Sequence, residues 1–328
     1  MDTRLDKKQT IERWGIRFTG IVQGVGFRPL VSLLAHQLGI NGFVYNDSSG
    51  VYVEAQSDTD TLQLFVDTIQ EEQPRLCRIT HVGITKVAPH DVDDNTEFVI
   101  SKSPLEGTVN TFISADTSPC EECLSEMNEK GRRYHYPFIN CTNCGPRYSI
   151  IKSMPYDRER TTMSDFTMCE ACHDEYVDVN GRRYHAEPNA CEQCGPSYQL
   201  LDNNGNLCVV DDCFEAAREM IAKGAIIALK GIGGYHLVCD ATNDTAVQTL
   251  RDRKHRKDKP FAIMAGSIDI VEEFAIVSDG DLDALSSMAR PIVLLEKNDD
   301  FHTSISELVA PNNHLIGVML PYAPIHHV

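Results

Sequence analysis

The chain has 328 residues, enough for two or three domains of ordinary size. Its hydrophobic content of 42% and charged content of 24% are typical of a globular protein, and its net charge of −18 argues against a general nucleic-acid surface. The polar stretch 1–10 lacks the apolar core of a signal peptide, and no apolar run reaches the roughly 18–20 residues of a membrane span, so we expect no membrane association.

The first segment, residues 1–101, predicts the element order βαββαβ with a short last strand, which is the ferredoxin-like plan. Apolar spacing indicates helices at Arg28–Leu38, stopped by Gly39, and at Asp60–Glu71. The expected strands are Trp14–Val22, Gly42–Asn46, Val51–Gln56, Ile79–Val87 and Glu97–Ser101.

The loop between the first strand and the first helix is a candidate anion site, with the sequence Gln23-Gly24-Val25-Gly26-Phe27-Arg28-Pro29. Two glycines allow the backbone to approach a ligand, and Pro29 suits the first turn of a helix. Backbone N–H groups, a helix N-terminus and the Arg28 guanidinium then point at one place. The glycine pattern alone favours a plain turn beside a solvated arginine.

Residues Gly20 to Arg28 resemble the signature loop of acylphosphatases, and the resemblance extends over the whole first segment. Acylphosphatases also have an asparagine eighteen residues after the arginine, on the next strand, and Asn46 stands there. The resemblance implies that the Gln23–Arg28 loop and the Arg28 side chain bind the phosphate and that Asn46 orients the attacking water. We therefore expect this segment to hydrolyse acyl phosphates without a metal.

The second segment, residues 102–200, begins with a predicted linker at 103–107 and contains a repeat with four Cys-x-x-Cys doublets. Gly131-Arg132-Arg133-Tyr134-His135 returns fifty positions later as Gly181-Arg182-Arg183-Tyr184-His185. The doublets, eight of the chain's twelve cysteines, are Cys120/Cys123, Cys141/Cys144, Cys169/Cys172 and Cys191/Cys194.

The spacing of these doublets is typical of zinc sites, because seventeen residues separate the first two and eighteen separate the last two. Four thiolates fill a tetrahedral shell, so we expect two structural zinc sites rather than catalytic ones. Duplication disfavours disulfides and redox pairs, while an interleaved pairing of the doublets stays open. We expect His135 and His185 to be packing or surface residues. Thiolate zinc sites also favour a reducing, cytoplasmic setting.

The third segment, residues 201–328, alternates predicted helices and strands, as in α/β domains. A helix is expected at Asp211–Lys223 and strands at Ala225–Leu229, as a buried strand, at Phe261–Ala265 and at Pro291–Glu296. The loop after Leu229, Lys230-Gly231-Ile232-Gly233-Gly234, is not a Walker A loop. Six Lys or Arg residues fall within 251–259, which indicates either a solvated charge run or a phosphate-binding patch.

The third segment resembles the YrdC-like fold, which forms carbonyl-adenylates from ATP, through Lys254, Arg256, Lys259 and Pro260. The resemblance implies that Lys230, Lys254, Arg256 and Lys259 bind the nucleotide. The Ser-x-Asn element of that fold has no match before Val328, so we expect an incomplete domain and a truncated chain.

The order of the three segments resembles the HypF family, carbamoyltransferases of nickel–iron hydrogenase maturation. Specific phrases are Pro137-Phe138-Ile139-Asn140-Cys141-Thr142-Asn143-Cys144-Gly145-Pro146 and Lys230-Gly231-Ile232-Gly233-Gly234. The resemblance implies hydrolysis of carbamoyl phosphate, formation of carbamoyl-adenylate from ATP with magnesium, and transfer to the C-terminal cysteine of HypE through a further domain that is not in this sequence. Two alternatives are a stand-alone acylphosphatase with accessory zinc units and a zinc-ribbon nucleic-acid binder.

Overall fold

The computed structural model describes residues 10–89, 97–104 and 111–328, and the chain falls into two compact units. The first unit combines residues 1–116 with 140–195, and the second combines 117–139 with 196–328. Residues 1–9 of the polar N-terminal stretch and 105–107 of the predicted linker lie outside the described residues. No helix in the described ranges is long and apolar enough to cross a membrane.

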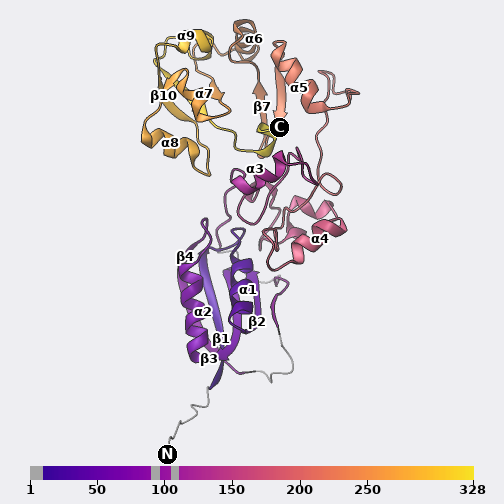
Figure 1. Ribbon diagram of the computed structural model, residues 1–328, viewed down its shortest axis with the longest axis vertical. Helices are drawn as coiled ribbons and strands as arrows, with labels where there is room; N and C mark the ends of the chain where they lie inside the picture. The colour runs from indigo at the N-terminus through magenta and orange to yellow at the C-terminus, as the bar shows by residue number, and fades with distance from the viewer. Residues whose placement is uncertain (1–9, 90–96, 105–110) are drawn as a thin grey trace, which may run out of the picture. The chain divides into compact units, whose positions relative to one another are not determined.

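The first unit is built on a five-stranded sheet with the order β4-β1-β3-β2-β5, in which only the β2–β5 pair is parallel (Figure 1). The elements are β1 (Ile11–Ile21), α1 (Phe27–Gln37), β2 (Asn41–Asp47), β3 (Gly50–Asp58), α2 (Thr59–Glu71), β4 (Arg78–Val87) and β5 (Phe98–Ile100). The predicted ferredoxin-like plan is confirmed. The short last strand extends the sheet beside β2.

Helices α1 and α2 cover one face of this sheet because their apolar residues recur at helical spacing (Figure 1). Leu62, Phe65 and Ile69 of α2 pack into the same buried cluster as Ile16 and Phe18 of β1. The Asp58 side chain accepts a hydrogen bond from the Thr61 backbone N–H at 3.0 Å and so caps α2.

The repeat in the cysteine segment reappears as two short helices, α3 (Glu121–Asn128) and α4 (Glu170–Val177). Each begins directly after the first cysteine of a doublet, Cys120 or Cys169, which takes the N-cap position with extended backbone angles. The sequence patterns had not indicated these helices. Single 3₁₀ turns at Tyr148–Ile150, Arg158–Arg160 and Thr162–Asp165 connect the two repeats.

The second unit contains a four-stranded sheet with the order β8-β11-β10-β9 and a separate β6–β7 hairpin. The strands are β6 (Ile227–Lys230), β7 (Tyr235–Val238), β8 (Ala262–Met264), β9 (Ala275–Ile276), β10 (Val293–Lys297) and β11 (Leu315–Met319). The helices are α5 (Cys213–Ala222), α6 (Asp244–Lys254), α7 (Ile268–Glu272), α8 (Asp279–Ser286) and α9 (Phe301–Ser304).

The expected strand at Ala225–Leu229 forms as β6, but the prediction that it is buried is wrong. Its residues alternate between partly buried and exposed, because β6 pairs with β7 alone in the described residues. The apolar core of this unit is formed instead by the four-stranded sheet and its helices, with Ile316, Val318, Phe274, Leu285 and Phe301 fully buried.

Candidate active site and metal sites

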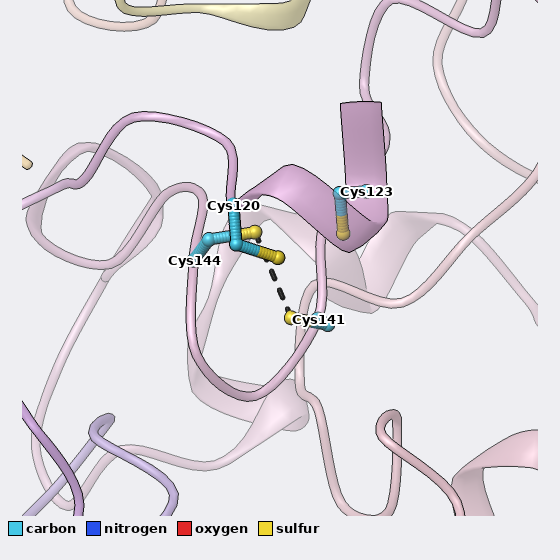
Figure 2. Close-up of side chains that lie close together, drawn as sticks. All are labelled: Cys120, Cys123, Cys141 and Cys144. Carbon is cyan, nitrogen blue, oxygen red and sulfur yellow. Dashed lines mark hydrogen bonds between the residues drawn. The ribbon is translucent and has the colours of Figure 1, made fainter. Parts of the chain in front are cut away.

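The eight doublet cysteines form two groups of four, each made by consecutive doublets. Cys120, Cys123, Cys141 and Cys144 make up one group, with their side chains gathered around one point in Figure 2. Cys169, Cys172, Cys191 and Cys194 make up the other. Within each group the sulfur atoms all lie within 4.8 Å of one another, so the pairing is sequential rather than interleaved.

The distances between sulfur atoms fit zinc coordination and exclude disulfides. Cys141 and Cys144 are 3.7 Å apart, and the measured pairs in the second group lie between 3.6 and 3.8 Å. A disulfide needs about 2.05 Å, whereas four thiolates about 2.3 Å from one zinc ion lie about 3.8 Å apart in a tetrahedron. Both groups therefore have the ligand set and spacing of structural zinc sites.

The second group also favours the thiolate form that zinc requires. Burial works to raise the pKa of the Cys194 thiol, but hydrogen bonds from the backbone and from neighbouring thiols lower it to about 7. His135 and His185, which both have left-handed backbone angles, belong to neither group. This grouping is consistent with the expectation from the sequence that both histidines are packing or surface residues.

The predicted anion loop forms the turn between β1 and α1. Gly24 and Gly26 have φ values of 70° and 79°, which glycine adopts without strain. The Gln23 side chain fixes the loop: its amide nitrogen donates to the Asp47 and Gly50 carbonyls at 2.7 Å each. Because the first N–H groups of α1 have no partner within the helix, the turn can present backbone donors to an anion.

Arg28, at the start of α1, is buried and bound to three acceptors from the cysteine segment. Its guanidinium donates to the carboxylates of Asp157 at 2.5 Å and Glu187 at 2.8 Å, and to the Tyr156 carbonyl at 3.0 Å. The Arg28 and Glu187 side chains are only 8% and 2% exposed. The solvated arginine considered from the glycine pattern is therefore excluded.

Asn46, near the end of β2, is fully buried and bound to the same carbonyl. Its side-chain nitrogen donates to the Tyr156 carbonyl at 2.9 Å, while its side-chain oxygen has no hydrogen-bond partner among the described residues. The structure thus brings together the two residues that the sequence proposed for hydrolysis, Arg28 and Asn46, at one backbone oxygen.

The charges around Arg28 keep its guanidinium protonated. Burial alone would lower the pKa of Arg28, but the charges of Asp157 and Glu187 raise it above its ordinary value. Burial raises the pKa of Glu187, an effect that the Arg28 charge opposes. Burial, with a smaller contribution from Arg28, lowers the pKa of His185 to about 4, so this imidazole is neutral near pH 7.

A small cavity lies between the loop and the cysteine segment of the same unit. It is lined by Gly24, Gly26, Arg28, Tyr156, His185 and Glu187, among others, and measures about 20 Å³. This volume accommodates about one water molecule, far less than an acyl phosphate.

Arg147 braces the loop from the other side. Its guanidinium donates to the Gly24 carbonyl and to four carbonyls in 141–146, among them Thr142 at 2.8 Å and Cys144 at 3.1 Å. A Cβ atom on Gly24 would lie 3.2 Å from the Arg147 side chain. The anion loop and the Cys141–Cys144 knuckle are thus held together by one buried side chain.

The proposed nucleotide residues differ in what they offer a ligand. Lys230, Lys254 and Lys259 are exposed. Arg256 instead donates to the Lys259 and Pro260 carbonyls and lies over the Phe261 ring at 4.8 Å. Arg256 therefore shapes the turn, and the lysines carry the accessible positive charge.

Sequence reasoning missed Asp157, Glu187 and the Tyr156 carbonyl. The first two are charged residues in a segment read as linking or repeating structure. One of them could have been noticed: Glu187 stands at the position that Pro137 occupies in the first of the two sequence repeats, so it departs from the duplicated pattern.

Three family models match successive parts of the chain. The model described as "Acylphosphatase" matches residues 14–100, and the "HypF finger" model matches 120–151 and 168–201. The "Telomere recombination" model of Sua5, YciO and YrdC proteins matches 219–328. The acylphosphatase of Thermotoga maritima is 35% identical over 82 residues, which cover 90% of that protein. The chain is thus a multidomain protein with an acylphosphatase domain, HypF fingers and a YrdC-like domain.

Longer relatives identify the family. A protein named carbamoyltransferase HypF from Rhodobacter capsulatus is 43% identical over 318 residues, covering 97% of this chain and 41% of that protein. A crystal structure of full-length HypF in a phosphate- and nucleotide-bound form matches with a TM-score of 0.90 and 42% identity, covering 98% of this chain and 42% of the other. HypF from T. kodakarensis matches with a TM-score of 0.87. The chain belongs to the HypF family and spans about two fifths of the length of these relatives.

Proposed function

We propose that this chain carries the first two steps of a carbamoyltransferase: hydrolysis of carbamoyl phosphate and adenylation of the released carbamate. The observation that carries the hydrolytic step is the convergence of Arg28 and Asn46 on one oxygen beside a glycine loop at a helix N-terminus. In this proposal, residues 1–101 carry out hydrolysis, residues 102–200 form the zinc fingers and residues 201–328 bind the nucleotide.

The hydrolytic site stabilises charge without a metal. The loop N–H groups and the permanently charged Arg28 receive the phosphoryl oxygens, and Asn46 orients a water for in-line attack on phosphorus. An uncharged amide is a poor base, so the substrate must supply a good leaving group. Carbamoyl phosphate does so: water attacks phosphorus, the bond from phosphorus to the bridging oxygen breaks, and carbamate and inorganic phosphate leave.

The nucleotide step is assigned to the YrdC-like part. The HypF structure with bound phosphate and nucleotide supports this assignment, as do the exposed Lys230, Lys254 and Lys259. Here the carbamate attacks the α-phosphate of ATP, held with magnesium, and pyrophosphate leaves as carbamoyl-adenylate forms. By relation to the family, the final acceptor is a cysteine of HypE, reached through a domain outside this sequence.

The fingers hold the hydrolytic site together rather than react. We infer one zinc per four-cysteine group, two per chain, because each group fills a tetrahedral shell and leaves no open position. Eight zinc-binding thiolates require reducing surroundings, which favours the cytoplasm.

Asn46→Ala tests the hydrolytic assignment. In the zinc-loaded chain we expect phosphate release from carbamoyl phosphate to lose about 100-fold in kcat, as when one transition-state hydrogen bond is removed, with a smaller change in KM. In this variant the Arg28 guanidinium still donates a hydrogen bond to the Tyr156 carbonyl, so the variant should fold. Gln56→Ala, which truncates another buried amide of the same sheet, is the matched control and should keep its kcat. Full turnover by Asn46→Ala contradicts the assignment.

A further inference from the structure

The side chains proposed for hydrolysis are oriented by groups outside the acylphosphatase domain. That domain ends near residue 100, yet every acceptor recorded for the Arg28 guanidinium lies between residues 156 and 187. The side-chain donor of Asn46 is bound there as well. All these residues lie in the first compact unit.

We propose that Asp157 is a positioning residue for acyl-phosphate hydrolysis: together with Glu187 and the Tyr156 carbonyl, it holds Arg28 and Asn46 in their catalytic orientation. This inference rests on the proposed function. It assigns a part in the hydrolytic step to the segment between the two HypF-finger matches, which contains Asp157, and to Glu187 in the second match.

The geometry at Arg28 leaves donors for the substrate. A guanidinium has five N–H donors, and three of them are used by Asp157, Glu187 and Tyr156. A long arginine side chain has many rotamers in solution, and fixing it beforehand removes that entropic cost from the reaction. The carboxylate of Asp157 accepts a hydrogen bond from one terminal nitrogen of Arg28. The Glu187 carboxylate and the Tyr156 carbonyl accept from the other terminal nitrogen.

Glu187 is itself firmly held, which makes it a rigid anchor. Its second carboxylate oxygen accepts from the Arg158 backbone N–H and from the Tyr176 hydroxyl, each at 3.0 Å. Arg158 in turn donates to the Asn189 carbonyl at 2.9 Å and the Phe166 carbonyl at 2.8 Å. Asp157 therefore directly precedes a residue that is held by several hydrogen bonds, and the next cysteine of a metal group, Cys169, comes twelve residues later in the chain.

The same carbonyl sets the orientation of Asn46. Because the Tyr156 oxygen takes the amide nitrogen, the amide cannot flip without losing that hydrogen bond. The side-chain oxygen is thereby left buried and without a partner in the described part of the chain. A buried oxygen without a donor is unfavourable, so it favours a water molecule that donates to it. A water bound in that way keeps a lone pair for attack on phosphorus, which is the role proposed for Asn46.

A positioning role and a blocking role make opposite predictions. If Asp157 and Glu187 merely competed with phosphate for Arg28, weakening them would lower KM and raise kcat/KM. If they position Arg28, weakening them lowers kcat while the loop N–H groups still bind phosphate. The split between kcat and KM therefore separates the two roles.

The experiment compares Asp157→Ala and Asp157→Asn in the zinc-loaded full chain, with carbamoyl phosphate and acetyl phosphate as substrates. We expect Asp157→Ala to lose about 10- to 100-fold in kcat, as expected for a misplaced catalytic group, with a smaller change in the inhibition constant of inorganic phosphate. Asp157→Asn retains an oxygen acceptor for Arg28 and should recover most of the loss. Unchanged or increased kcat/KM in Asp157→Ala overturns the inference.

Glu54→Gln is the matched control, because Glu54 pairs with the buried Arg13 on the same sheet but far along β3 from the loop. It should lower stability without lowering kcat, which separates a general structural effect from positioning. If Asn46→Ala loses activity and Asp157→Ala does not, the inference fails while the proposed function stands. If the parent chain hydrolyses neither substrate, the proposed function fails, and the inference fails with it.

Discussion

Replacing Arg28 by alanine should destabilise the protein as well as inactivate it. The sequence alone predicts that Arg28→Ala stays folded, because Arg28 is not a core apolar residue. The structure instead places it in ion pairs with two carboxylates, of which Glu187 is 2% and Asp157 22% exposed. Removing one partner of a buried ion pair costs about 3–5 kcal/mol, because a buried charge is left without compensation.

The structure favours the lower end of that range. Glu187 keeps its hydrogen bonds from Arg158 and Tyr176, and Asp157 is partly in contact with solvent. We therefore expect Arg28→Ala to lower the free energy of unfolding by about 3 kcal/mol. Such a loss is large against the usual domain stability of about 5–15 kcal/mol.

Urea unfolding followed by tryptophan fluorescence measures this loss of stability in the first unit, which contains both Arg28 and the reporting tryptophan. Trp14, the single tryptophan, is 6% exposed in β1 of the first unit. Lys86→Ala is the control, since Lys86 is 70% exposed in its pair with Glu12 on the same sheet. A surface pair of this kind contributes about 0–1 kcal/mol.

The loss should also depend on pH in a defined direction. Without Arg28, Glu187 loses the charge that opposes the burial-driven rise of its pKa. The folded variant then binds more protons than the unfolded chain, so its stability rises as pH falls. The difference from the parent should shrink between pH 7 and about pH 5. A variant within 1 kcal/mol of the parent at pH 7, with no such change, would refute the reasoning.

Two further predictions concern metal and acid. Elemental analysis should give two zincs per chain, and a chelator should abolish acyl-phosphate hydrolysis, because Glu187 lies between zinc-binding doublets; one zinc, or full activity after chelation, would contradict this. Burial lowers the pKa of both His185 and His326 to about 4, so the unfolded chain binds more protons between pH 4 and 6.5. Stability should therefore fall as pH drops through that window, by up to about 3 kcal/mol per histidine. His185→Asn, which tolerates the left-handed backbone, should flatten this slope in the Trp14 signal, and an unchanged slope would exclude His185 as its source.

Local patterns were sufficient where the chemistry is local. The anion loop spans only a few consecutive residues, and its glycines and Pro29 indicate the backbone geometry of the turn without any distant contact. The cysteine doublets are equally local, and their spacing predicted four-cysteine zinc sites, although it left open whether the doublets pair sequentially or interleave. The ferredoxin-like sheet followed from alternation and helical spacing in short stretches.

Other features depend on contacts that no local pattern records. Asp157 and Glu187 meet Arg28 across 129 and 159 residues of chain. The charge run at 251–259 indicated either a solvated run or a phosphate-binding patch, and composition did not show that the Arg256 guanidinium binds the carbonyls of Lys259 and Pro260, three and four residues further along the chain. Likewise β6 is less buried than its apolar composition indicated, since burial depends on which neighbours the fold supplies.

The long separation between Arg28 and Glu187 also imposes an order on biosynthesis. At about 5–20 residues per second, a ribosome needs about 8–32 s to make the 159 residues between them. During that interval the sheet of β1 to β4 can form, but the arginine has no carboxylate from the finger region to hold it. On the proposed function, the site around Arg28 is thus completed only after Glu187 has emerged from the ribosome. A nascent chain that ends before the finger region therefore lacks the carboxylates proposed to position Arg28.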